Sequence, residues 1–103
     1  MADARLVTAT ITGDDEWTDS IRLSGAFDLS IAGSFTATVT VQRSYDNATW
    51  RDVDTFTAAT EETGYQGEIA YYRAGVKTGE FTSGGPITLM LAGSAGIDYT
   101  PQR

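Results

Sequence analysis

The sequence predicts an all-β fold: a single antiparallel β-sandwich or small barrel of about seven or eight strands. Three observations predict it. Apolar residues recur with a period of two rather than 3.6, threonine and other β-branched residues are frequent, and turn signals separate short segments. The clearest case is "SFTATVTVQR", where Phe35, Ala37, Val39 and Val41 alternate with polar residues. This pattern predicts a half-buried strand whose outer face is lined by threonine.

The strands expected in the first half of the chain lie between turn sequences. Residues 6–11 precede the acidic turn "GDDE", residues 18–23 end at "SG", residues 26–31 end at "AG", and residues 34–43 end at "SYDNAT". Glycine supplies the positive φ that tight hairpin turns need. We therefore expect a tight hairpin around Ala32 and Gly33.

The second half predicts four further strands. Strands are expected at residues 50–56 and 71–77, and a short extra strand at residues 66–70. The glycine-rich "ETGYQGE" (residues 62–68), which overlaps this extra strand, is a turn signal and predicts a loop. The last strand is expected at residues 86–92. Pro86 should open it, because a proline at the first position of a strand removes the N–H that matters least.

The length of 103 residues predicts one domain rather than two. We expect its core to span about residues 6–92. The segment 93–103 is poorly patterned and contains Tyr99 and Pro101. It is expected either to fray or to serve as a C-terminal arm that docks on a neighbour.

The chain contains no histidine and no cysteine. Disulfides, thiolate metal sites and cysteine nucleophiles are therefore excluded, and so are a Ser-His-Asp triad and a conventional zinc site. The commonest general base is also missing. We accordingly expect neither enzymatic activity nor a cofactor.

The charge balance is strongly acidic, with 14 acidic residues against 7 basic ones and a formal net charge of −7. Such a field repels phosphate backbones and anionic membranes, and the basic residues are scattered. There is no apolar run of membrane-spanning length, and the first ten residues have no apolar signal core. We expect a soluble chain made in the cytosol, without a nucleic-acid or membrane partner.

Two acidic groups are candidate sites. Asp14, Asp15, Glu16 and Asp19 in "GDDEWTD" could ligate calcium, but their spacing differs from that of the 12-residue calcium loop, and a solvated turn is the simpler interpretation. In "RDVDTF", two aspartates lie two residues apart and are expected on one strand face. They could serve glycoside hydrolysis, or form a charged surface that discourages edge pairing.

The stretch "SYDNATW" predicts a structural turn. Ser44, Asp46, Thr49 and Trp50 match in type the Asp-box pattern Ser-x-Asp-x-Gly-x-Thr-Trp of sialidases and other β-propellers, although the loop is one residue short and lacks the glycine. In such a turn an aspartate accepts backbone N–H groups, and the tryptophan packs on the hairpin. Asn47 belongs to the same turn. The motif therefore favours a stable hairpin rather than sugar hydrolysis.

Exposed aromatic residues are the candidate contacts, because tyrosine and tryptophan are enriched in interfaces. A sugar-stacking platform is the alternative use for such rings. The expected contact residues, with two arginines as ion-pair partners, are Trp17, Tyr45, Tyr65, Tyr99, Arg22 and Arg73.

Three segments together carry a family resemblance. They are "RLSGAFDLSIAGSF" (residues 22–35), "TVQRSYDNATWRDV" (residues 40–53) and "YYRAGVKTGEFTSG" (residues 71–84). In this order they resemble a small β-rich family of virion structural proteins of tailed bacteriophages, over about residues 20–92. Ala48 and the shortened turn depart from the glycine-rich version in that family.

The resemblance implies a structural component of the virion without catalytic residues, made in the host cytoplasm. The leading hypothesis is a capsid decoration (cement) protein that binds the outer shell as a dimer or trimer. A host-attachment or carbohydrate-binding module of the tail or fibre is the alternative, and a tail or connector ring component is a third hypothesis.

Overall fold

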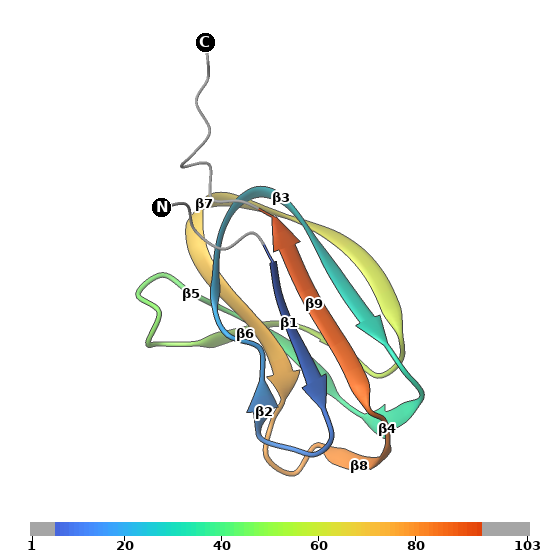
Figure 1. Cartoon of the computed structure of the whole chain (residues 1–103). Helices are drawn as coiled ribbons and strands as arrows, with labels where there is room; N and C mark the ends of the chain where they lie inside the picture. Colours follow the sequence, from blue (N-terminus) through green and yellow to red (C-terminus); the bar gives the residue numbers. More distant parts are fainter. Residues whose placement is uncertain (1–5, 94–103) are drawn as a thin grey trace.

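The computed structural model describes residues 6–93, which form nine strands and no helix (Figure 1). The expected all-β class is confirmed. In this part of the chain there is accordingly no helix that could cross a membrane. The strands are β1 (Leu6–Ile11), β2 (Glu16–Trp17), β3 (Ile21–Ala32), β4 (Phe35–Ala37), β5 (Val39–Ser44), β6 (Arg51–Phe56), β7 (Thr60–Val76), β8 (Phe81–Gly84) and β9 (Ile87–Gly93).

Seven strands form one antiparallel sheet in the order β1-β9-β3-β7-β5-β6, with β2 also paired to β7. The short strands β4 and β8 form a separate sheet. The two ends of the main sheet, β1 and β6, are not paired with each other, so the sheet does not close into a barrel. Of the two expected architectures, the barrel is therefore not formed.

The long strands β3 and β7 bend at one end of the molecule and fold the sheet into two layers (Figure 1). The first part of β7 pairs with β3, from Thr60 opposite Ile31 to Tyr72 opposite Ile21. Its last part pairs with β5, from Tyr71 to Gly75. One layer thus contains β1, β9, most of β3 and the first part of β7, and the other contains the end of β7 with β2, β5 and β6.

The core lies between these layers and follows the period-two pattern of the sequence. On β9, Ile87, Leu89 and Leu91 are each 0% exposed, whereas Thr88 between them is exposed. Val39 and Val41 of β5 face these residues from the second layer as part of the same apolar cluster. Burying one such side chain fully contributes about 1.5–3 kcal/mol.

The two strands expected at residues 18–23 and 26–31 are in fact one strand, β3. The "SG" signal between them marks an irregularity of register between Leu23 and Gly25, where Gly25 has a φ of 81°. Glycine here allows a β-bulge, which increases the local bend of the strand, rather than a turn.

The prediction of a single strand at residues 34–43 is also wrong, because the structure has two strands there, separated at Thr38. The Thr38 N–H donates to the carbonyl of Glu80, so the chain leaves the small sheet at β4 and enters the main sheet at β5. The exposed threonine face is also wrong for β5: Thr40 is 1% exposed and Gln42 is 7% exposed. Both residues lie on the outer face of the second layer, beneath the side chains described below.

The hairpin expected around Ala32 and Gly33 does not form. Strand β3 pairs with β7 and β9, and not with β4. Gly33 instead lies where the chain changes sheets: a Cβ at this position would be 2.5 Å from the carbonyl oxygen of Pro86. Glycine is required here for two reasons: its φ is 124°, the positive φ that the sequence predicted, and another segment approaches closely.

The loop expected in "ETGYQGE" is also absent, since these residues lie within the 17-residue β7. Gly64 pairs with Phe27, and a Cβ there would lie 2.5 Å from the phenylalanine ring. The glycine makes room for a cross-strand aromatic ring. The strands expected at residues 66–70 and 71–77 are consequently parts of one longer strand.

The other strand predictions agree with the structure closely. Residues 6–11 form β1, while β6 begins one residue later than expected and β9 begins directly after Pro86. Gly93, expected as the start of an arm, is the last residue of β9. The remainder of the predicted arm, residues 94–103, lies outside the described residues.

Candidate functional site

The outer face of the second layer carries the densest group of interacting polar and aromatic side chains. Along the end of β7, Tyr72 and Ala74 are buried in the core, so the alternating Arg73 and Gly75 face outward. Paired residues in an antiparallel sheet share a face. Gly75 pairs with Trp17, and Arg73 with Gln42, so these residues lie together on this face.

Arg73 is held between the two tryptophans of the chain. Its guanidinium carbon lies 4.3 Å from the ring centroid of Trp17 and 4.5 Å from that of Trp50. Each such cation–π contact contributes about 0.5–1 kcal/mol at an exposed site. Burial lowers the pKa of Arg73, but a guanidinium remains charged at every pH at which proteins fold.

A chain of hydrogen bonds fixes this arginine from the side. The Nε of Arg73 donates to Oε1 of Gln42 over 2.8 Å, and Nε2 of Gln42 donates to Oδ1 of Asp52, also over 2.8 Å. Lys77 forms a salt bridge with the other oxygen of Asp52. The bonds from Lys77 and Gln42 lower the pKa of Asp52, and the bond to Asp52 raises the pKa of Lys77.

Gly75 allows Trp17 to lie flat against the sheet. A Cβ at Gly75 would be 2.2 Å from the carbonyl oxygen of Glu16 and 2.6 Å from Cδ2 of Trp17. The two-residue strand β2 therefore packs closely on β7 at Gly75, a position that only glycine can occupy. We call the group formed by Trp17, Arg73, Trp50, Gln42 and Asp52 the Arg73 cluster.

The turn after β5 is built on the carboxylate of Asp46. Its Oδ1 accepts the backbone N–H groups of Ala48 and Thr49 over 2.9 and 2.7 Å, and the hydroxyl of Ser44 over 2.8 Å. Asn47 has a φ of 59°, in the left-handed region that asparagine tolerates. The carboxylate of Asp46 accepts backbone N–H groups as the motif predicts, and Trp50 stacks on Arg73.

These hydrogen bonds lower the pKa of Asp46 far below its usual range; the largest contribution comes from the Thr49 N–H, followed by those from Ser44 and Ala48. A lowered pKa means that the carboxylate stabilises the turn above the usual aspartate pKa of about 4. This stabilisation is lost as the pH falls through the lowered pKa. We expect the amide signals of Ala48 and Thr49 to stay unchanged down to about pH 3 in an NMR titration.

Asp46→Asn is the control for this titration, because it removes the titrating carboxylate and should leave both amides insensitive to pH. A midpoint near pH 4 for the two amides of the unchanged protein would show that the hydrogen bonds do not hold the carboxylate in its charged form.

The expected contact residues are only partly brought together. Arg22 pairs with Tyr71 and so shares the outer face with the Arg73 cluster. Tyr45 is 63% exposed, and its ring lies 5.4 Å from the guanidinium carbon of Arg43. Tyr65 is 76% exposed and lies on the first part of β7, in the other layer. Tyr99 lies outside the described residues.

The aspartates of "RDVDTF" do not share a face as expected. The register shifts between Val41 and Gln42, and this bulge turns Asp52 toward Gln42 on the outer face. Asp54 instead lines a cleft that also includes Val41. The sequence contains no signal for this bulge, so alternation alone misassigned the two carboxylates.

The carboxylates of the acidic turn are used within the fold. Asp14 accepts the N–H of Gly79 over 2.8 Å, and Glu16 accepts the N–H of Thr12 over 2.7 Å. Across residues 6–93, no group of three or more acidic side chains is arranged to hold a metal ion.

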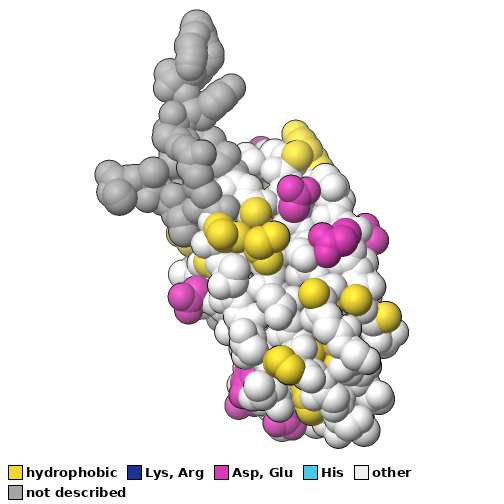
Figure 2. Space-filling view, turned by 45° about the vertical axis from the view of Figure 1, so that its right-hand side comes forward, with side chains coloured by type: hydrophobic (Ala, Val, Ile, Leu, Met, Phe, Trp, Pro, Cys, Tyr) yellow, Lys and Arg dark blue, Asp and Glu magenta, His cyan; other side chains and the backbone are white. Residues whose placement is uncertain are grey.

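The first layer presents a different surface. On its outer face Ser30 donates to Glu61 over 2.7 Å and Thr63 donates to Asp28 over 3.2 Å. Figure 2 shows acidic side chains separated by apolar and uncharged ones on one side of the molecule. The stack of Arg73 on Trp17 and Trp50 lies on the second layer instead.

Sequence reasoning named Trp17, Arg73 and Trp50 but missed Gln42 and Gly75. A glycine inside a strand pattern indicates close approach of another backbone or ring, and that signal could have identified Gly75. Gln42 was expected to be exposed, and nothing in its neighbours indicates that Arg73 would cover it.

The fold and this cluster define a small all-β protein with a rigid aromatic–arginine surface. Comparisons with protein-family models, with curated proteins and with solved structures found no match. Any function of the chain is therefore argued from its own residues and geometry.

Proposed function

We propose that the chain is a structural protein of a tailed-phage virion, and specifically a capsid decoration protein that binds the outer shell as an oligomer. The family resemblance of the three sequence segments supports the virion role. The proposed contact surface is the Arg73 cluster, in which one arginine is fixed between two indole rings.

The cluster has the properties of a binding surface. Tryptophan, tyrosine and arginine dominate the binding energy of interfaces when they sit in well-packed positions. Here Gln42 and Asp52 already hold the arginine, so little side-chain entropy remains to be lost on binding. The net charge of −7 would keep free copies soluble until they meet a complementary surface.

The proposed oligomer fits the small size of the domain and the area that a stable contact requires. A stable interface buries about 800 Å² on each partner, which is a large share of the surface of such a small chain. A dimer or trimer placed over a junction between shell subunits would supply that area through repeated smaller contacts, and linked contacts strengthen one another.

The test is binding to expanded heads of the phage that encodes the protein. Trp17→Ala is expected to weaken binding about 30-fold or more, because loss of a central aromatic contact costs about 2 kcal/mol or more. Tyr65→Ala is the matched control, since it removes an exposed aromatic from the other layer and should change binding less than about threefold. Affinity is measured by co-sedimentation at constant salt.

Circular dichroism must first show that Trp17→Ala is folded; Arg73→Lys provides a second variant that keeps the charge but loses the planar stacking. Equal binding by all four proteins would disprove the role of the cluster. Failure of the unchanged protein to bind heads would disprove the decoration role itself.

A glycan-binding function is the second candidate, favoured by an open hollow beside the Asp46 turn. The hollow has a volume of ≈ 540 Å³ and includes Tyr45, Asp46 and Arg51. Tyr45 is the aromatic residue that lines this hollow, so it would have to provide the stacking surface. If no glycan on an array binds the protein, this function is ruled out. If a glycan does bind, equal affinity of Tyr45→Ala for it would show that Tyr45 does not provide the stacking surface.

A further inference from the structure

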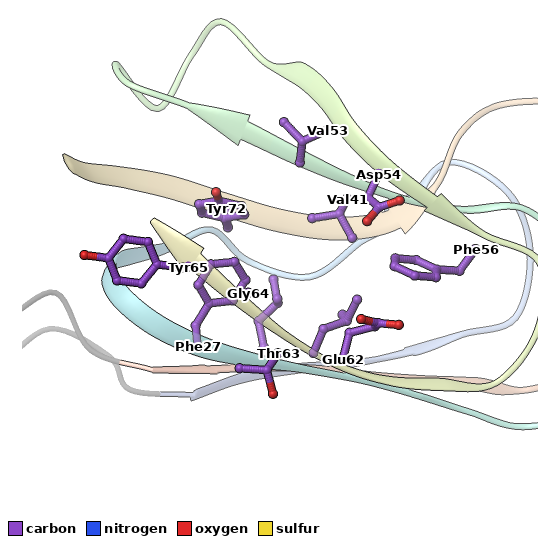
Figure 3. A pocket seen from close by; sticks show the side chains of 12 residues that line it. Phe27, Val41, Val53, Asp54, Phe56, Glu62, Thr63, Gly64, Tyr65 and Tyr72 are labelled. Carbon is purple, nitrogen blue, oxygen red and sulfur yellow. The ribbon is translucent and has the colours of Figure 1, made fainter. Parts of the chain in front are cut away.

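An apolar cleft lies between two unpaired strand edges. Within the described residues, β6 pairs only with β5, and residues 60–66 of β7 pair only with β3. These two edges flank a cleft with a volume of ≈ 180 Å³ (Figure 3). An unpaired edge presents free N–H and C=O groups to any extended segment that can pair with it.

The interior of the cleft is apolar, and apolar side chains on its rim are exposed. Phe27, Val41 and Tyr72 lie in its interior, and Val53 and Tyr65 lie on the two flanking strands (Figure 3). Val53 is 39% exposed and Tyr65 is 76% exposed. Exposed apolar side chains beside an apolar cleft favour an occupant that covers them.

The described part of the chain stops beside this cleft. Gly93 pairs with Phe27, and Phe27 pairs with Gly64, which lines the cleft. Because neighbouring strands are about 4.8 Å apart, Gly93 lies roughly 10 Å from Gly64. An extended segment spans about 3.3 Å per residue, so three or four residues after Gly93 suffice to reach the opening.

The sequence that follows suits the cleft. In "SAGIDYTPQR", Ile97 and Tyr99 are two residues apart, so both would face the same side of an extended strand, with Asp98 and Thr100 on the other side. The small residues before Ile97 leave the approach unobstructed, and Pro101 would end the pairing.

Direction and charge agree with this placement. A segment that enters beside Tyr65 and runs toward Glu62 is antiparallel to β7, the direction that strand pairing favours (Figure 3). The far end of the cleft carries Asp54 and Glu62, and Arg103 is the basic residue of the segment. Arg103 would follow the bound residues beyond this end of the cleft, so the charge of the segment is complementary there.

We propose that residues 97–101 of the chain's own C-terminal segment bind in this cleft as an added strand along the unpaired edge of β7, with the Ile97 and Tyr99 side chains on its apolar interior. Attachment at Gly93 keeps the segment near the cleft at high effective concentration. This inference does not depend on the proposed virion role, and it would close the open side of the sandwich.

A pair of introduced cysteines tests the proposal, because the chain has none of its own. The full-length variant Val53→Cys/Ile97→Cys should form a disulfide within one chain. The control, Asp28→Cys/Ile97→Cys, places the first cysteine on an exposed position of β3 opposite Ala92, which an undocked segment also reaches. We expect the cleft pair to oxidise at least about tenfold faster, measured by mass spectrometry and non-reducing electrophoresis.

Equal oxidation rates for the two pairs would overturn the proposal. Disulfides that form mainly between two chains would also overturn it, because a second copy would then be the occupant.

A second readout leaves the cleft itself unchanged. Hydrogen exchange of the amides in residues 53–56 and 60–65 should become at least about tenfold faster in Tyr99→Ser than in the unchanged protein. Thr100→Ser, on the opposite side of the segment, should have no such effect. Unchanged exchange in Tyr99→Ser would contradict docking in the cleft.

Discussion

Replacing Leu89 with alanine is expected to lower the free energy of unfolding by about 2–5 kcal/mol. Leu89 is 0% exposed on the central part of β9, between Ile87 and Leu91, which are buried to the same extent. The substitution removes the transfer free energy of the side chain and leaves a cavity where two layers meet. For a domain of this size, the loss corresponds to a fall in Tm of roughly 10 °C or more.

Thr88→Ala is the matched control, because Thr88 precedes Leu89 on the same strand but is exposed. It should change the free energy of unfolding by no more than about 0.5 kcal/mol. Urea denaturation followed by circular dichroism measures both variants. Similar losses in the two variants would show that the core does not lie between the layers as described.

Replacing Gly75 with alanine is expected to lower the free energy of unfolding by about 1–3 kcal/mol and to disrupt the Arg73 cluster. The new Cβ would lie 2.2 Å from a backbone oxygen and 2.6 Å from the Trp17 ring, so β2 must move away from β7. Both tryptophans of the chain belong to the cluster, so tryptophan fluorescence should report the change directly.

Gly67→Ala serves as its control within the same strand. A Cβ at Gly67 meets nothing within 4 Å, and its φ lies outside the left-handed region. Its stability should be unchanged or raised by up to about 1 kcal/mol, because alanine restricts the unfolded chain more than glycine does. If Gly75→Ala retained the fluorescence and stability of the unchanged protein, the close packing of Trp17 on β7 would be wrong.

The fold class was predictable because alternation and turn chemistry act locally. The buried Ile87, Leu89 and Leu91 can be recognised from the period-two pattern of the last strand, and the Asp46 turn from its residue types. The glycines were misread where a distant contact decides their role. Gly64 makes room for the Phe27 ring, and Gly33, whose positive φ was expected, also lies against the Pro86 carbonyl; no local pattern reveals these two contacts.

The candidate site was predictable in its residue types but not in its geometry. Trp17 and Arg73 were expected as contacts and Trp50 as part of a structural turn, yet their stacking depends on β2 and β5 lying on either side of β7. The separation of Asp52 from Asp54 depends on a bulge that the alternating pattern does not encode. Non-local pairing therefore accounts for most of what sequence reasoning missed.

The most direct test of the proposed function is the copy number of the protein in intact virions of the phage that encodes it, measured by quantitative mass spectrometry. A decoration protein repeats with the symmetry of the shell, so on the order of hundreds of copies per particle are expected. Absence from purified virions, or about a dozen copies or fewer, would contradict a role on the capsid surface.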